Sequence, residues 1–265
     1  RYSQNRRFLP DLRPMLPLLA EDSPHLDLLH PARRLWRRRL QSCRLINLEQ
    51  MILGVQRSED DVPGHLIPDL YTAYLRTGDA GEMRRVFYHN GEDIVTMVAL
   101  AERLSRAYHA SAAGQNEPLD GLDLAALGKV YERANQPALA ETAYRRALEQ
   151  VRSSQDRAEL FHALGRLLKR QGRWEEACEI WQLWLTSVPG VDPTPYIELA
   201  KCCEWQLNDL EQAEMWAAWA LHTLNRAGNA HGFPGARAEL ERRLARLQRK
   251  RGAGLDRPGT APAQG

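Results

Sequence analysis

The stretch Tyr88-His89-Asn90-Gly91-Glu92-Asp93-Ile94 holds residue types that can bind a metal ion and move a proton. His89 and Asp93 are four residues apart, so on an α-helix their side chains project from the same face. The apolar residues that follow at helical spacing are Ile94, Val98, Ala101 and Leu104. This pattern predicts a helix docked on a core with its polar corner left open. A His and an Asp one turn apart also occur as an ordinary surface pair, so the surrounding sequence has to decide between the two.

Upstream of this stretch lies a series of short blocks in a fixed order. They are His25–Trp36, Cys43–Leu45, Asn47–Glu49, Leu53–Gly54, Val62–Gly64, Ile67–Pro68 and Tyr74–Gly78. In this order, and closed by His89–Asn90 and Asp93–Ile94, the series resembles the C-terminal half of the YprB-type ribonuclease H-like domain. That family is similar to the DEDD 3′–5′ exonucleases of the DnaQ-like group. The resemblance covers residues 1 to about 108 and depends on the agreement of several blocks in order.

The resemblance implies a metal-dependent nuclease that acts on DNA or RNA with two Mg²⁺ or Mn²⁺ ions. Such sites use four carboxylates in three motifs, and Asp93 matches the acid of the third motif as a metal ligand. His89 matches the residue that takes the proton from the attacking water. Its spacing from Asp93 is the one usual for a Tyr at this position, whereas Tyr88 has the spacing usual for His. The identity of the general base therefore stays open between His89 and Tyr88.

The first two motifs of the family have no counterpart in this sequence. No acid-x-acid pair on a strand precedes Asp93, and the sequence opens at Arg1 without an initiator Met. We therefore expect a fragment of a longer nuclease, with an incomplete two-metal site and no activity on its own. The alternative is a non-catalytic module that binds nucleic acid or serves as a protein-interaction scaffold.

A basic segment near the start is the candidate nucleic-acid contact. Arg33, Arg34 and Arg37 lie on a predicted helix, Ala32–Leu40, and could hold phosphates. The alternative is a solvated face whose arginine stems cover apolar surface. The formal net charge is only +2 at pH 7, so the whole chain has no strong electrostatic attraction to nucleic acid.

Beyond residue 120 the sequence repeats. Two copies place Leu-Gly, aromatic and Ala residues where tetratricopeptide repeats have them, most clearly at Leu164–Gly165, Ala177 and Trp181, and a third copy that begins at Leu199–Ala200 is degenerate. The small residues let paired helices approach closely, and the aromatic residues fill the space between pairs. The resemblance implies a stack of antiparallel helix pairs that binds a protein partner. Most of the tryptophans after residue 170 are then expected in its core.

These patterns divide the chain into four regions. Residues 1–109 are the C-terminal half of an α/β ribonuclease H-like domain, 110–121 a linker, 122–250 helical repeats with a capping helix at 236–251, and 251–265 a disordered tail. The first region is expected to be mostly helical, with a strand at Leu26–Leu29 and two helices, Ala80–His89 and Glu92–Tyr108, that meet at Asn90–Gly91. The predicted fold class is mainly α.

The remaining composition bears on the compartment. No apolar run approaches the length needed to cross a bilayer. Cys43, Cys178, Cys202 and Cys203 form no Cys-x-x-Cys pair and no metal-ligand spacing. They predict free thiols in a reducing compartment, so we expect a cytoplasmic protein in which they act as small buried apolar residues.

Overall fold

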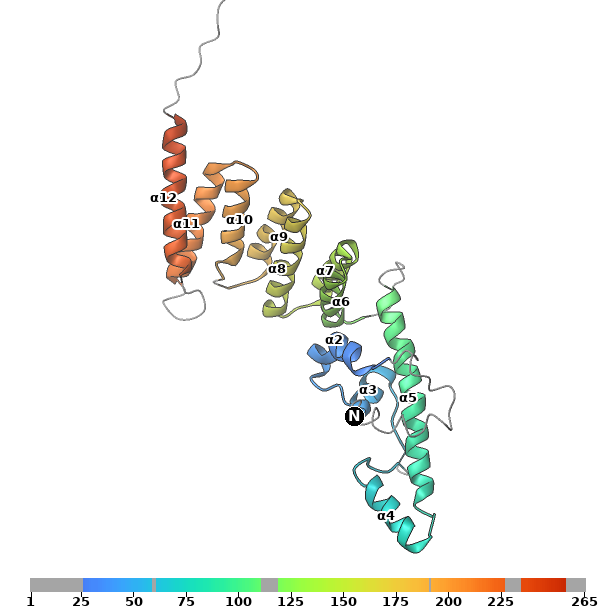
Figure 1. Cartoon of the computed structure of the whole chain (residues 1–265). Coiled ribbons are helices and arrows are strands. Elements are labelled where there is room, and N and C mark those ends of the chain that lie inside the picture. Colours follow the sequence, from blue (N-terminus) through green and yellow to red (C-terminus); the bar gives the residue numbers. More distant parts are fainter. Residues whose placement is uncertain (1–25, 59–60, 111–118, 191, 227–234, 256–265) are drawn as a thin grey trace, which may run out of the picture. The chain divides into compact units, whose positions relative to one another are not determined.

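The computed structural model describes residues 26–58, 61–110, 119–190, 192–226 and 235–255. It divides into two compact units, Arg1–Arg133 and Ala134–Gly265. Within the described residues the regular structure is helical and no strand occurs (Figure 1). The expected mainly helical class is therefore confirmed, whereas an α/β layer is not seen. Residues 1–25 and most of the predicted linker and tail lie outside the described residues.

The described helices of the first unit are α2 (Leu29–Leu40), α3 (Leu45–Leu48) with its π-helical continuation η1 (Glu49–Leu53), α4 (Ile67–Thr77), α5 (Met83–Ala110) and α6 (Gly121–Arg133). Several boundaries follow local signals. Gly54 and Gly78 end helices with φ of 68° and 72°, the left-handed conformation that glycine adopts without strain. Pro68 stands in the first turn of α4, where its missing N–H costs nothing.

Helix α2 turns its apolar face inward and its arginines outward. Ala32, Leu35 and Trp36 are buried. On the side that packs against α6, Arg39 donates to both carboxylate oxygens of Asp123, with Nη2 to Oδ2 at 2.8 Å. Burial raises the pKa of the Asp123 carboxyl, and the hydrogen bonds from Arg39 oppose that rise. This ion pair fixes how α2 meets α6.

The strand predicted at Leu26–Leu29 is wrong, because Leu29 already begins α2. The Asp27 carboxylate accepts a hydrogen bond from the Leu29 backbone N–H at 2.9 Å, as side chains at helix starts do. Pro31 follows in the first turn, where a helix tolerates it. Local helix-start chemistry thus outweighs a four-residue apolar pattern that is too short to define a strand.

The predicted break at Asn90–Gly91 is also wrong, because α5 runs without interruption through both residues. A glycine inside a helix costs only about 1 kcal/mol relative to alanine. The C-terminal half of α5 is anchored by Leu100 and Leu104, which are buried, whereas Ile94 and Val98 are 51% and 66% exposed. The apolar stripe that begins beside Asp93 is therefore covered only towards its C-terminal end.

The second unit holds α7 (Pro137–Gln150), α8 (Ser154–Arg170), α9 (Trp174–Ser187), α10 (Thr194–Trp205), α11 (Leu210–Arg226) and α12 (Ala236–Leu255). Successive helices pack side by side (Figure 1). The small residues expected between paired helices are buried, among them Ala140, Ala177, Ala200, Ala213 and Ala220. The capping helix extends four residues beyond the predicted Arg251, so the first part of the predicted disordered tail is helical.

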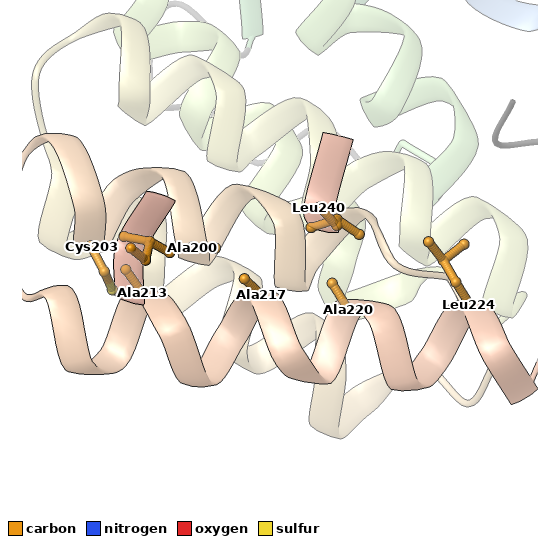
Figure 2. Close-up of a cluster of buried hydrophobic side chains, with 8 residues drawn as sticks. Ala200, Cys203, Ala213, Ala217, Ala220, Leu224 and Leu240 are labelled. Carbon is orange, nitrogen blue, oxygen red and sulfur yellow. The ribbon is translucent and has the colours of Figure 1, made fainter. Parts of the chain in front are cut away.

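The core between α10, α11 and α12 is built mainly from alanine. Ala213, Ala217 and Ala220 line one face of α11 and meet Ala200 and Cys203 of α10, with Leu240 of α12 over them (Figure 2). Because alanine side chains are small, the axes of α10 and α11 can lie close together.

Helix α12 is tied to α10 by one buried carboxylate. The Glu204 side chain has no exposed surface and accepts hydrogen bonds from Arg243, Arg246 and Lys250. Burial raises the pKa of Glu204, but these cations outweigh it and the pKa is lowered overall. Glu204 therefore stays ionised and holds the end of the stack.

The tryptophans are divided between core and surface. Trp181 and Trp184 are buried, as predicted, whereas Trp205 and Trp219 are 56% and 49% exposed. The core interpretation is therefore wrong for the last two. None of the described helices has the length and apolar composition that a bilayer crossing requires.

We expect that any side chain at residue 165 weakens the packing of α8 on α9. A Cβ there would lie 2.7 Å from Cε2 of Trp181, too close for two carbon atoms. We expect Gly165→Ala to lower the free energy of unfolding of the second unit by about 1–3 kcal/mol. Urea unfolding followed by tryptophan fluorescence reports mainly this unit, since only Trp36 precedes Ala134. Gly252→Ala on α12, with open space around the Cβ, is the matched control and should not destabilise. Equal effects of both variants would contradict the packing argument.

Candidate functional site

His89 and Asp93 lie in a polar cluster that we call the Arg57 cluster: Glu49, Arg57, Asp61, His89 and Asp93. Glu49 opens η1, Arg57 and Asp61 belong to the loop that follows, and the last two residues are on α5. Three segments that are separate in the sequence therefore meet at one guanidinium group.

The strongest contact in the cluster joins Arg57 to Glu49. Nε of Arg57 donates to Oε2 at 2.8 Å and Nη2 donates to Oε1 at 2.5 Å, a bidentate arrangement. The side chain of Glu49 is only 1% exposed. Hydrogen bonds to Glu49, and then to Asp93 and Asp61, raise the pKa of Arg57 above its ordinary value against the effect of burial. The pair is therefore a fixed, buried ion pair.

Asp93 is held from two sides. Its Oδ1 accepts from Arg57 Nη2 at 2.5 Å, and its Oδ2 lies 3.6 Å from His89 Nε2. The prediction that His89 and Asp93 share a helix face is thus confirmed. The Asp93 side chain keeps 28% of its surface exposed, which is the largest share in the cluster. It is the carboxylate that solvent or a ligand reaches most easily.

The imidazole of His89 is oriented by Asp61. Nδ1 lies 2.8 Å from Asp61 Oδ1 and 3.1 Å from Arg57 Nη1. Because the ionised Asp61 carboxylate can only accept, the 2.8 Å contact requires a protonated Nδ1 that donates to it. A protonated Nδ1 cannot accept from Arg57, whose Nη1 donates to Asp61 Oδ2 at 3.1 Å instead. Burial raises the pKa of Asp61, but hydrogen bonds from His89 and Arg57 outweigh it, so the pKa is lowered. The Nε2 side of the ring then faces Asp93.

The donor set does not fit a two-metal centre within the described residues. No group of three or more His, Cys, Asp or Glu side chains is arranged there to hold a metal ion. The space between Glu49, Asp61 and Asp93 is taken by the guanidinium of Arg57. Three carboxylates and one guanidinium leave the cluster with a net charge of −2 when the imidazole is neutral, so the cluster still attracts cations.

Other candidates from the sequence lie outside this cluster. The Tyr88 hydroxyl accepts a hydrogen bond from Ser58 at 3.3 Å, whereas His89 Nε2 lies 3.6 Å from Asp93 Oδ2, so the geometry favours His89 over Tyr88 beside that carboxylate. Asp27 lies two residues before the first residue of α2 and accepts a hydrogen bond from the Leu29 N–H. His25 lies outside the described residues.

The predicted phosphate-binding arginines are exposed on α2. A hollow of about 690 Å³ lies beside them; it is lined by Leu29, Arg33, Arg37, Gln41, Ser42, Cys43, Arg44 and Leu45. Arg34 is outside this hollow, and Arg44 is an addition that the sequence analysis did not assign. Burial raises the pKa of the Cys43 thiol, while the nearby Arg33 and Arg37 act in the opposite direction. The hollow is therefore a concave basic surface.

The sequence analysis missed Glu49, Arg57 and Asp61. Glu49 ends the block Asn47–Glu49, whereas Arg57 and Asp61 lie between the blocks Leu53–Gly54 and Val62–Gly64. The sequence signal that could have indicated these residues is an arginine close to several acids in Arg57–Asp61, shortly after a helix that ends at a glycine. Their meeting with α5 needs the tertiary structure.

Arg57 should be needed to keep the cluster folded. Replacing it by Met leaves the buried Glu49 carboxylate without a partner, which costs about 3–5 kcal/mol in comparable buried pairs. We expect Arg57→Met to increase hydrogen exchange in peptides from residues 49–61 and from α5. Adding Glu49→Gln should restore part of the protection, because the orphaned charge is then gone. Arg44→Met, at an exposed arginine of the same unit, is the control and should leave exchange unchanged. Protection that survives in Arg57→Met would show that the pair is dispensable.

Comparison with known proteins places the cluster in a family context. Residues 5–105 match the RNase H superfamily model. The chain is 30% identical over 241 residues to the uncharacterized protein YprB of Bacillus subtilis (strain 168), over 90% of this chain and 55% of that protein. It thus spans about half the length of this curated relative. The crystal structure of PcrH from Pseudomonas aeruginosa is 20% identical, with a TM-score of 0.39 over 48% of this chain and 91% of that one. The similarity to the RNase H superfamily therefore covers residues 5–105, which include every residue of the Arg57 cluster.

Proposed function

We propose that this chain is part of a metal-dependent nuclease, 3′–5′ exonuclease-like and cytoplasmic, that acts on DNA or RNA. The observation that carries the proposal is that the RNase H superfamily match spans both His89 and Asp93, and that these two lie together in one partly buried cluster. Members of this superfamily usually use divalent metals. Asp93 would contribute one carboxylate to an Mg²⁺ or Mn²⁺ ion, which prefers oxygen ligands.

In this proposal His89 accepts a proton at Nε2. Its Nδ1 is held by Asp61 at 2.8 Å, which sets the orientation of the ring and the nitrogen that stays unprotonated. Histidine is suited to this role because its ordinary pKa lies close to neutral pH. Arg57 positions Asp93 at 2.5 Å and neutralises part of the charge that an anionic phosphate would meet.

Arg33 and Arg37 are proposed to bind phosphates of the nucleic acid, with Arg34 as a further contact outside the hollow. Arg33 and Arg37 line the same hollow on α2, so both can reach one backbone. Arginine donates in a fork that matches two phosphate oxygens. All three side chains are exposed to solvent on α2.

A second candidate function is a protein-interaction scaffold of the tetratricopeptide type in the second unit. A groove of about 470 Å³ supports it; its lining includes His162, Trp184 and Tyr196 from α8, α9 and α10. Aromatic side chains on a concave helical surface suit the binding of a peptide. This function is compatible with the nuclease and would stand alone if no activity exists.

Replacing Asp93 distinguishes the nuclease function from the scaffold function. In the full natural protein that carries this sequence, we expect Asp93→Asn to reduce Mn²⁺-dependent degradation of single-stranded DNA or RNA by at least about 100-fold, as loss of a charged transition-state contact does. Asp69→Asn on α4 is the matched control and should retain activity. Far-UV circular dichroism checks that both variants fold. Full activity in Asp93→Asn would remove the assigned role.

The basic hollow predicts a salt-dependent contact. We expect Arg33→Ala with Arg37→Ala to weaken binding of a single-stranded oligonucleotide. The slope of log affinity against log salt concentration should fall by roughly 1.4, since each phosphate contact on a single strand accounts for about 0.7. Fluorescence anisotropy over a salt series measures both quantities. Arg76→Ala, at the end of α4, provides the comparison. Equal slopes in the two proteins would place the nucleic acid elsewhere.

A further inference from the structure

The second unit contains a pair of buried thiols that neither the nuclease nor the scaffold uses. Cys178 lies on α9 and Cys202 on α10, and their sulfur atoms are 2.8 Å apart. The exposed fractions of the two residues are 8% and 3%. Both are free thiols in the structure. Two helices that pack directly on each other thus bring one reactive sulfur each to the same point.

We propose that Cys178 and Cys202 form a peroxide-sensitive thiol pair, which closes to a disulfide and locks α9 to α10. A disulfide S–S bond is about 2.05 Å long, so the two sulfurs need to approach by less than about 1 Å. The site is a modification site for a small oxidant. Hydrogen peroxide is the chemical class that fits, because the two residues are almost fully buried and a bulky disulfide reagent would have to open the helices first.

The hydrogen bonds assign a role to each sulfur. The Cys178 S–H donates to the Cys202 sulfur, and the Cys202 S–H donates to the carbonyl oxygen of Trp174 at 3.6 Å. The hydrogen bond from Cys178 lowers the pKa of Cys202 against the effect of burial, and the same bond raises the pKa of Cys178. Of these two thiols, Cys202 is therefore the one that more readily forms the thiolate, which is the nucleophilic form.

The reaction balances with peroxide as the only oxidant. The Cys202 thiolate attacks one oxygen of H₂O₂, an S–O bond forms and the O–O bond breaks, and the leaving hydroxide takes a proton to become water. The Cys178 sulfur then attacks the Cys202 sulfur of the sulfenic acid. An S–S bond forms, the S–O bond breaks, and the second water leaves with the Cys178 proton. Two thiols have lost two electrons and two protons, and one H₂O₂ has become two waters.

Cys203 provides an internal comparison, since it is equally buried and adjacent in sequence. It belongs to the alanine-rich core with Ala213 and Ala217 on the α11 side (Figure 2). One residue along a helix turns the side chain by about 100°, so Cys202 and Cys203 point in different directions. Cys178 also forms a hydrogen bond with Cys203 and lowers the pKa of that thiol, but the 2.8 Å contact between sulfur atoms joins Cys178 to Cys202.

The test treats the folded chain with hydrogen peroxide and then counts thiols and maps disulfides by mass spectrometry without reduction. We expect the four thiols to fall to two, a mass lower by two hydrogen atoms, and one peptide pair joined through Cys178 and Cys202. Dithiothreitol should reverse all three changes. Cys43→Ser and Cys203→Ser should behave like the wild type, whereas Cys178→Ser should form no intramolecular disulfide and should stop at a sulfenic acid on Cys202.

Two results would overturn the proposal. One is that all four thiols persist in the folded wild-type chain at peroxide concentrations that oxidise the urea-unfolded chain. The other is that the mapped bond joins Cys43 or Cys203. Mapping is done on the wild type, so its outcome does not depend on whether a variant folds. Nuclease activity plays no part in the readout, so this result is independent of the proposed function.

Discussion

The bidentate pair between Glu49 and Arg57 is the contact on which the first unit depends. A carboxylate that is almost wholly buried is tolerated only when it is paired and hydrogen-bonded. Glu49 fixes the position of Arg57, and the two nitrogens Nη1 and Nη2 then reach Asp61 and Asp93. The loop after η1 and the helix α5 are thereby tied to one guanidinium. The position of Asp93, and with it the candidate site, follows from a charge buried elsewhere.

The second unit also contains a buried carboxylate that must be paired, that of Glu204. Its side chain has no exposed surface, and three cationic side chains of α12 form ion pairs with it. Between these charged contacts the helices are held by close packing of small residues, as where Trp181 lies against Gly165. Each unit therefore combines apolar packing with buried acids that are paired with cations, namely Glu49 and Asp123 in the first unit and Glu204 in the second.

What the sequence predicts well is what depends on neighbouring residues. Gly54 and Gly78 end helices because glycine adopts a positive φ without strain. The spaced alanines of the second unit are buried because small side chains let paired helices pack closely. The predictions fail where contacts between distant residues outweigh a local sequence signal. Asn90–Gly91 is a strong turn signal, yet the packing of α5 on either side overrides it.

The candidate site was predictable only in part for the same reason. His89 and Asp93 share a helix face by spacing alone, and that face is seen. The partners that orient them come from residues 28 to 36 positions earlier in the chain, as with Asp61 and Arg57. No periodicity relates a loop arginine to a carboxylate at that distance. Such pairings are properties of the tertiary fold.

If Asp93 binds a cation as proposed, that binding is coupled to the stability of the loop that carries Arg57. Asp93 Oδ1 is already engaged by a guanidinium, which has a fixed geometry and cannot lose its proton. A divalent ion that binds this oxygen must replace that hydrogen bond, while Glu49 still holds Arg57 in place through two bonds. The affinity of Asp93 for a cation is therefore the ionic attraction minus the free energy of the displaced contact. The residual charge of the cluster favours the cation, and the Glu49–Arg57 pair sets how much of that attraction remains.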